Sequence, residues 1–147
     1  MIVKIISGGQ TGADRGGLEA GKELGILTGG TAPKGYRTEN GSDLFLKELG
    51  LVEHTSSSYP PRTVDNVRNS DGTIIFGNIN SPGCKLTIST CIKFKKPYII
   101  NPTEQDFRNW IDKKFIRILN VAGNRENTNS GIQERVKQFL ISSLLIK

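Results

Sequence analysis

Hydrophobic and polar positions alternate along this chain in blocks that predict strands followed by helices. Short apolar runs, rich in β-branched residues, are typical of buried strands. They occur at residues 2–6, 73–76, 97–100 and 116–121, and a weaker strand is expected at residues 27–30. The run at 73–76 is apolar throughout, so its strand should be buried on both faces, as in a parallel sheet.

Helical patterns fill the spaces between these runs, at residues 14–24, 43–49, 62–69, 86–94 and 104–113 and in a final helix from residue 132. One stripe of the final helix is apolar and should pack on the core. It comprises Ile132, Val136, Phe139, Leu140 and Leu144. The persistent alternation predicts an α/β fold, namely a single Rossmann-like three-layer domain over residues 1–147 with a mostly parallel sheet flanked by helices.

Composition narrows the function classes. Two cysteines and one histidine, His54, are too few for a disulfide scaffold or a zinc site, so we expect no metal and a reducing, cytoplasmic compartment. No apolar run approaches the roughly 20 residues of a membrane span, and no export signal is expected. The net charge of +6 favours phosphate-bearing partners, with solubility as the alternative.

The stretch SGGQTGAD places glycines between the first strand and the first helix. Such glycines let backbone N–H groups approach an oxyanion, and the helix N-terminus adds a favourable dipole potential. The spacing matches neither the dinucleotide fingerprint nor the Walker loop. We expect a phosphate-binding loop, with a plain structural turn as the alternative, formed by Gly8, Gly9, Gln10, Thr11 and Gly12.

The helix after this loop begins with Asp14 and Arg15. Asp14 is expected to cap the helix, or else to accept a hydrogen bond from a ribose hydroxyl or an amine. Arg15 either reaches an anion beside the loop or is a solvated charge. Three glycines inside the helix, at positions 16, 17 and 21, each cost about 1 kcal/mol relative to alanine. The helix should therefore lie very close to the sheet or to a ligand.

Further loops carry polar and basic residues. Residues 31–42 are expected to form a loop that closes over a ligand, and residues 56–61 only a connecting loop. The first of these contains Lys34, Gly35, Tyr36, Arg37 and Glu39. Residues 120–131 leave the last strand and should place Asn120, Gly123 and Arg125 at the carboxyl edge of the sheet, where ligands bind in open parallel sheets.

The stretch NINSPGCKLT repeats the arrangement of strand, glycine turn and helix after the strand at 73–76. Ser81 and Gly83 would form a second anion nest with the amides of the next turn, supported by Lys85 and Thr87. An ordinary helix N-terminus is the alternative. Cys84 is interpreted as a small residue, because no histidine stands nearby in sequence to activate it.

Together these motifs resemble the family named putative molybdenum carrier proteins, over nearly the whole chain. The segments that carry the resemblance are SGGQTGADRGGLEAGKELGI, TGGTAPKGYRTENG, RTVDNVRNSDGTIIF, SPGCKLT, KKP and LNVAGNRENTNSGI. That family belongs to the SLOG group of Rossmann-like domains, with sensors of nucleotide-derived ligands, Lonely Guy phosphoribohydrolases and DprA. The resemblance implies binding of the molybdenum cofactor, a phosphorylated pterin with a metal dithiolene, or of a nucleotide, and pairing of copies.

The resemblance also adds Arg62, Asn66 and Arg68 to the candidate ligand-binding residues. Arg62 and Asn66 are four positions apart and should share one helix face, whereas Arg68 should point elsewhere. Salt bridges are the alternative role for either arginine. The chain has SPGCK where the family more often has a glycine pair followed by a small residue. It also lacks the glutamate of the Lonely Guy PGGxGTxxE motif, which weakens an enzymatic interpretation.

Three functions follow from these observations. The first is a binding or carrier protein for an anionic, phosphate-bearing small molecule. The second is a nucleoside-monophosphate N-glycosidase in which Asp14 or Glu39 serves as the catalytic carboxylate. The third is DprA-like binding of single-stranded nucleic acid, against which the 7% aromatic content and the absence of interleaved basic and aromatic residues argue.

Overall fold

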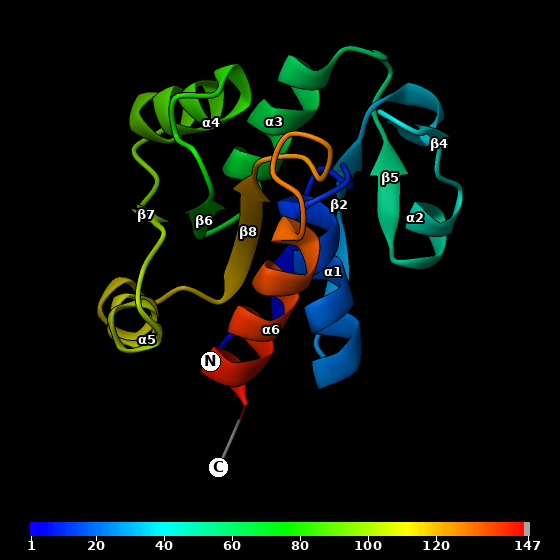
Figure 1. The fold of residues 1–147 in the computed structure, drawn as a ribbon. Coiled ribbons are helices and arrows are strands. Elements are labelled where there is room, and N and C mark those ends of the chain that lie inside the picture. Colours follow the sequence, from blue (N-terminus) through cyan, green and yellow to red (C-terminus); the bar gives the residue numbers. More distant parts are fainter. Residues whose placement is uncertain (146–147) are drawn as a thin grey trace.

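The computed structural model of the protein describes residues 1–145 and has a six-stranded parallel sheet in the order β5-β2-β1-β8-β6-β7 (Figure 1). The strands are β1 (Lys4–Ile6), β2 (Leu27–Ala32), β5 (Leu51–Glu53), β6 (Gly72–Phe76), β7 (Tyr98–Ile100) and β8 (Ile118–Gly123). Because all six run in one direction, the loops that follow them gather at one edge of the sheet.

Helices cover both faces of the sheet, which gives the three-layer arrangement that the sequence predicted. Helices α1, α5 and α6 pack together on one face, and α3 and α4 pack on the other (Figure 1). The short helix α2 lies beside the edge strand β5. The helices are α1 (Ala13–Leu24), α2 (Phe45–Glu48), α3 (Tyr59–Arg68), α4 (Pro82–Lys93), α5 (Glu104–Lys114) and α6 (Ile132–Leu144).

The core confirms the two strongest predictions from hydrophobic patterning. Every residue of β6 is buried, as expected for a central parallel strand covered by helices on both faces. Along α6, Ile132, Val136 and Leu140 are buried, and Phe139 and Leu144 pack against the same core cluster. The 3.6-residue period of the apolar positions therefore located this helix and its inner face.

The glycines inside α1 allow this helix to lie unusually close to its neighbours. A Cβ atom on Gly17 would lie 2.7 Å from Cβ of Val121 in β8. A Cβ atom on Gly16 would lie 2.4 Å from the carbonyl oxygen of Gln133 in α6. The predicted close approach to the sheet is confirmed, and a second close approach, to α6, accompanies it. Both hold the start of α1 beside the loop that follows β8.

Three loop predictions need correction. Residues 31–42 are not a simple loop, because β2 continues to Ala32 and a 3-10 turn then leads into a small antiparallel hairpin of β3 (Arg37–Thr38) and β4 (Gly41–Ser42). Residues 59–61 belong to α3, since prolines are accepted in a first helical turn, where N–H groups lack intrahelical acceptors. Asn120 lies inside β8, buried, and donates to Oγ1 of Thr73 (3.2 Å).

A tightly packed helical glycine and an open one predict opposite effects of alanine substitution on stability. Gly17→Ala should lower the free energy of unfolding by about 1–3 kcal/mol, because its methyl group would overlap Val121. Gly83→Ala, in α4, should leave stability unchanged or raise it by up to about 1 kcal/mol, since a Cβ there meets nothing within 4 Å. Urea unfolding of the two variants measures both effects. Equal stability of the two variants would contradict the close packing of α1.

Candidate functional site

The candidate site is a cavity of about 460 Å³ at the carboxyl edge of the sheet. Its walls come from the loops after β1 and β8, the first turns of α3 and the first turns of α4. In the sheet, β2 and β5 extend from β1 toward one edge, and β6 and β7 lie toward the other edge, with β8 between β1 and β6. The strand order therefore reverses in the middle of the sheet, and the cavity lies near this point. Open α/β sheets bind ligands at such points.

Asp14 is the buried carboxylate of this site and is only 5% exposed. Its Oδ2 accepts a hydrogen bond from the backbone N–H of Gln10 (3.2 Å) and lies 3.5 Å from Nη1 of Arg62. Burial raises the pKa of Asp14, against the opposing attraction of Arg62. Asp14 does not cap α1 as expected, because Gly12 occupies the cap position and no side chain accepts there.

The glycine-rich loop at residues 8–12 is largely occupied by the protein's own hydrogen bonds. The N–H of Gly9 donates to Oγ of Ser7 (3.2 Å), and the N–H of Gly12 donates to Oε1 of Gln133 (3.1 Å). With the N–H of Gln10 on Asp14, three of the amides expected to bind phosphate already have acceptors within the protein. Ser7, Asp14 and Gln133 therefore provide acceptors for amides that the sequence suggested for an external anion.

Arg62 lies directly across this loop. A Cβ atom on Gly8 would come within 2.0 Å of Nη1 of Arg62, so only glycine at position 8 lets the guanidinium occupy this place. Nε of Arg62 is buried and has no hydrogen-bond partner among the described residues. Burial lowers the pKa of Arg62, although Asp14 opposes that shift. The arginine is thus desolvated and incompletely paired at the wall of the cavity.

Three guanidinium groups surround the ring of Tyr59. The central carbons of Arg125, Arg37 and Arg62 lie 4.2, 4.7 and 5.6 Å from the ring centroid, within the range of cation–π attraction. Within residues 1–145, only Arg62 of the three also forms an ion pair with a carboxylate, that of Asp14. The mouth of the cavity therefore carries an excess of positive charge.

The first turn of α4 forms the opposite wall. Ser81 caps the helix by accepting the N–H of Cys84 (3.3 Å), and Gly83 faces open space. The hydroxyl of Thr87 donates to the carbonyl of Gly83 (3.0 Å). Cys84 is buried, and burial raises the pKa of its thiol, so the helix N-terminus does not activate it. Cys84 is a packing residue, as the sequence suggested.

Asn124 joins the loops that form this edge. Its Oδ1 accepts from the N–H of Asn78 (2.6 Å), and its Nδ2 donates to the carbonyl of Asn78 (3.2 Å). The same Nδ2 lies 3.3 Å from Oγ of Ser81, and the carbonyl of Asn124 accepts from the N–H of Ala13 (3.1 Å). The loops after β1, β6 and β8 are thereby held in one arrangement.

The structure brings part of the predicted set together and separates the rest. The predicted ligand-binding residues that line the cavity are Gln10, Asp14, Arg62, Ser81, Gly83, Thr87 and Arg125. Gly9, Thr11 and Arg15 line a separate hollow of about 210 Å³, to which Gln10 also contributes. Gly8 lies beneath Arg62 and Gly12 packs against the backbone of residues 124–126, so both shape the loop.

Several predicted residues have structural partners instead. Arg15 pairs with Asp43, and Glu39 accepts a hydrogen bond from Thr11. Asn66 bonds both backbone groups of Thr31 (2.9 and 3.0 Å) and so fastens α3 to β2. Arg68 lies over the ring of Phe94 (5.4 Å), away from Arg62, as the helix geometry predicted. Lys34 and Lys85 are exposed, and Gly35 donates its N–H to Glu53 (2.8 Å).

The other chemical candidates form no site of their own. His54 is half-buried, with Nε2 3.5 Å from Oδ2 of Asp65 and Nδ1 accepting the N–H of Ser56 (2.8 Å). In the part of the chain that the structure describes, no three His, Cys, Asp or Glu side chains are grouped to hold a metal ion. None of the helices there is long and apolar enough to cross a membrane.

Comparison with known proteins identifies the family. The model of the Circularly permutated YpsA SLOG family matches residues 5–144. The chain belongs to this SLOG family. It also matches the crystal structure, at 1.45 Å resolution, of a protein named "Putative molybdenum carrier protein" from Syntrophus aciditrophicus SB. The two sequences are 35% identical, the TM-score is 0.88, and the match covers 99% of this chain and 96% of the other. No curated protein matches this SLOG chain.

Sequence reasoning missed four polar residues that line the cavity of this SLOG domain, namely Tyr59, Thr63, Asn124 and Thr128. Tyr59 stood in a stretch expected to be only a loop, and its role depends on Arg62 of its own helix and on Arg37 and Arg125 from two distant segments. Arg37 was noted in the loop after the second strand but was not assigned to the site. A rule that pairs aromatic residues with nearby basic loops would have selected Tyr59 and Arg37.

The raised pKa of Asp14 predicts how the stability of this SLOG domain depends on pH. Because the folded state binds the Asp14 proton more tightly than the unfolded state, this group's contribution is present below its unfolded pKa of about 3.9. It is lost as pH rises through the folded pKa. The free energy of unfolding of the wild type, relative to Asp14→Asn, should therefore fall with rising pH.

Urea unfolding of both proteins between about pH 3.5 and 8 measures this difference. A difference that increases with pH would show that the attraction of Arg62 outweighs burial and would contradict the assignment. Parallel stability curves would mean that Asp14 titrates equally in the folded and unfolded chains.

Proposed function

We propose that this protein binds an anionic, phosphate-bearing small molecule in the cavity between Arg62, Arg125 and the first turn of α4. The observation that carries the proposal is the charge arrangement, in which three guanidinium groups converge on Tyr59 while Asp14 is the buried carboxylate beside them. Guanidinium groups bind phosphate oxygens in paired geometry, and the α4 N-terminus adds its dipole. The phosphate would lie between the arginines and Gly83.

The ligand classes proposed are the molybdenum cofactor and nucleotide-derived molecules, with the chain acting as a carrier. The cavity of about 460 Å³ lies in the range of small-molecule sites, and the name of the similar Syntrophus protein supports the carrier role. Cys84 is buried with a raised pKa, so its sulfur is not offered as a thiolate. Recognition of a phosphorylated pterin would then depend on its phosphate rather than on a bond from this thiol to the metal.

The proposal also includes the cell compartment and the pairing of copies. Cys84 and Cys91 are both free and buried, which suits a reducing compartment such as the cytoplasm. We also propose that two copies of the chain pair, as the resemblance to related Rossmann-like domains implies.

Arg125 provides the test of the phosphate site. Adenosine monophosphate should bind the wild type, and Arg125→Met should raise the dissociation constant about 10- to 100-fold, the loss expected for a charged hydrogen bond. Arg117→Met removes an equal charge from the exposed position just before β8 and should change binding less than about twofold. Isothermal titration calorimetry with adenosine monophosphate, inorganic phosphate and molybdate measures these constants.

Native mass spectrometry of the freshly purified protein should also show a released phosphorylated pterin or nucleotide. Failure of all three titrants to bind, together with an empty purified protein, would contradict the proposed function. Binding of molybdate alone would redirect it to a free oxyanion.

One observation favours a second candidate, an N-glycosidase acting on nucleoside monophosphates. Asp14 is a buried carboxylate with a raised pKa at the wall of this cavity, and a carboxylate whose pKa is perturbed in this way is a candidate general acid or base. It would stabilise the oxocarbenium-like sugar or activate water while the arginines hold the phosphate.

For this second candidate, the wild type should release a free base from at least one nucleoside monophosphate. Asp14→Asn should abolish release, a loss of about 100-fold or more, while changing the dissociation constant little. Chromatography of the released base over a panel of monophosphates measures both proteins. Full turnover by Asp14→Asn would exclude Asp14 as the catalytic carboxylate, and the absence of turnover in the wild type leaves the carrier role.

A further inference from the structure

Exposed apolar side chains gather at the end of the molecule opposite the candidate site. All strands of the parallel sheet begin at this amino edge, and the helices that return the chain to the next strand end there. The large apolar side chains exposed at this end are Met1, Val3, Leu27, Ile92, Phe115 and Leu145. Single exposed apolar residues are normal on a soluble protein, whereas a group of them on one face is typical of an interaction surface.

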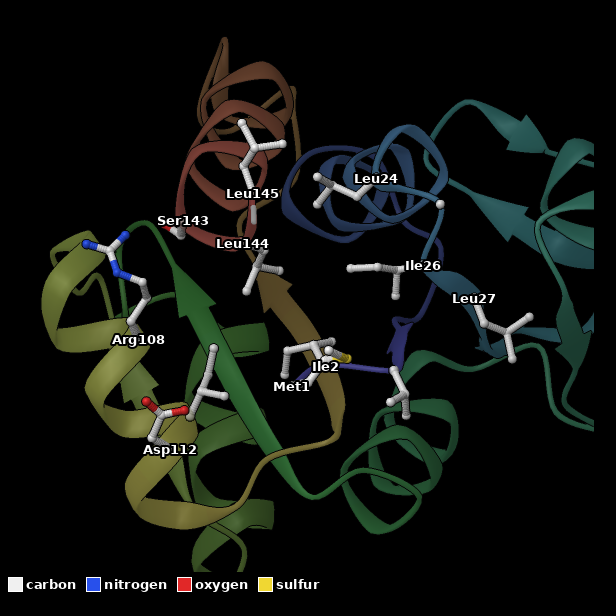
Figure 2. Close-up of a pocket in the computed structure, with 13 residues that line it drawn as sticks. Met1, Ile2, Leu24, Ile26, Leu27, Arg108, Asp112, Ser143, Leu144 and Leu145 are labelled. Carbon is white, nitrogen blue, oxygen red and sulfur yellow. The ribbon is translucent and has the colours of Figure 1, made fainter. Parts of the chain in front are cut away.

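A hollow of about 840 Å³ opens among these side chains (Figure 2). Met1 and Ile2 lie in its middle, with Leu27 on one side and Asp112 on the other (Figure 2). The candidate site contributes no residue to it. Whatever covers this end of the molecule must therefore fit an apolar concavity as well as contact the exposed side chains around it.

Basic residues continue the same edge of the sheet. The carbonyl of Arg117 accepts the N–H of Val3 (2.8 Å), and the carboxylate of Asp71 accepts the N–H of Arg117 (3.0 Å). Nζ of Lys96 donates to the carbonyl of Ser70 (2.8 Å). The segments before β1, β8, β6 and β7 are therefore neighbours. The exposed cations of these segments are Arg68, Lys93, Lys95, Lys113, Lys114 and Arg117.

These six cations are not neutralised by carboxylates. Within residues 1–145, none of them forms an ion pair. The acidic residues of the same segments are Asp71, which accepts the N–H groups of Arg117 and Ile118, and the exposed Asp112. Unpaired positive charge thus lies directly beside the exposed apolar surface.

Phe115 lies where the basic and apolar parts meet, and its side chain has almost no packing role. It is 83% exposed and ends α5 in the left-handed conformation, with φ 55° and ψ 45°. Glycine or asparagine is usual at this position, because a bulky side chain is strained there. A strained and exposed ring that follows Lys113 and Lys114 indicates contact with a partner outside the chain.

The mixture of side chains indicates which polyanion fits. Phe94 and Phe115 do stand among basic residues, which the expectation from sequence overlooked, but Arg68 (5.4 Å) covers the ring of Phe94. Single-stranded nucleic acid would find few open rings for stacking, and aliphatic side chains offer none. A lipid surface with anionic headgroups attracts the cations and accepts aliphatic side chains as well. Acyl chains also adapt to a hollow, whereas a folded partner needs a matching protrusion.

We infer that this end of the molecule docks on the surface of a bilayer that contains anionic lipids. Phe115, Leu27 and Ile92 enter the boundary between headgroups and acyl chains, and the six cations contact the headgroups. The chain lies on the bilayer without crossing it. The candidate site, at the other end of the strands, faces away from the lipid and stays accessible.

Vesicle co-sedimentation of the full chain tests this inference. The protein should sediment with vesicles of phosphatidylcholine containing about 30% phosphatidylserine and not with vesicles of phosphatidylcholine alone. Raising sodium chloride from about 0.1 to 0.5 M should release most of the bound protein, because salt screens the attraction between the cations and the headgroups.

Phe115→Gly separates a role in binding from a role in folding. It should weaken vesicle binding about tenfold, because the inserted ring is lost. It should also raise the midpoint of thermal denaturation, since glycine adopts the left-handed conformation without strain. Val52→Ser removes an exposed apolar side chain from the edge strand β5 and should leave vesicle binding unchanged.

Matched removal of one positive charge then locates the attraction. Lys114→Met should weaken vesicle binding about fivefold, the effect of one cation near an anionic surface. Arg125→Met removes an equal charge from the anion cavity and should leave vesicle binding unchanged. The same two proteins distinguish this surface from the proposed function, because only Arg125→Met should weaken binding of adenosine monophosphate.

Four results would overturn the inference. They are no binding of the wild type to the anionic vesicles, an equal loss of binding in Phe115→Gly and Val52→Ser, a loss in Arg125→Met but not in Lys114→Met, and binding of a single-stranded oligonucleotide through Phe115 and Lys114 without binding of vesicles. The third result would assign the headgroup contact to the anion cavity, and the fourth would assign this face to nucleic acid.

Discussion

The burial of the Asp14 carboxylate is the constraint around which the candidate site is built. A carboxylate this far from water needs partners, and the chain provides them from two directions, with the Gln10 amide from its own loop and Arg62 from α3. The hydrogen bond from the Gln10 amide to Asp14 closes the glycine-rich loop on itself. The ion pair with Asp14 places the side chain of Arg62 against Gly8. This crossing and the two hydrogen bonds of Asn66 to Thr31 hold α3, and with it Tyr59, beside the loop.

An external anion therefore meets arginines rather than the amides of the first loop. The general expectation for a glycine-rich turn after a first strand is a nest of free N–H groups, but here an internal carboxylate fills part of that nest. The excess positive charge of the site is carried by Arg125 and Arg37, because these two side chains contact the face of the Tyr59 ring instead of a carboxylate. Cation–π contacts hold these side chains without neutralising them, so their charge stays available.

The sequence predicted the fold well because the spacing of apolar residues follows which positions of each strand and helix are buried. The apolar run at 73–76 and the stripe along α6 gave the correct elements, and helical glycines at 16 and 17 correctly indicated close packing. It predicted the site only in part. Side chains of Gln10, Arg62 and Arg125 do converge, yet a single sequence does not show that Arg15 is paired with Asp43 or that Tyr59 collects three arginines. Such outcomes depend on which distant loops meet.

The position of Asn124 has a consequence for the kinetics of recognition. Its side chain fixes the loops after β6 and β8 through backbone groups, and its carbonyl fixes the start of α1. The entropy of ordering these loops is consequently lost when the chain folds and not again when a ligand arrives. A ligand entering such a rigid, positively charged site needs no slow rearrangement, so encounter should be limited mainly by diffusion and should slow as added salt screens the arginines.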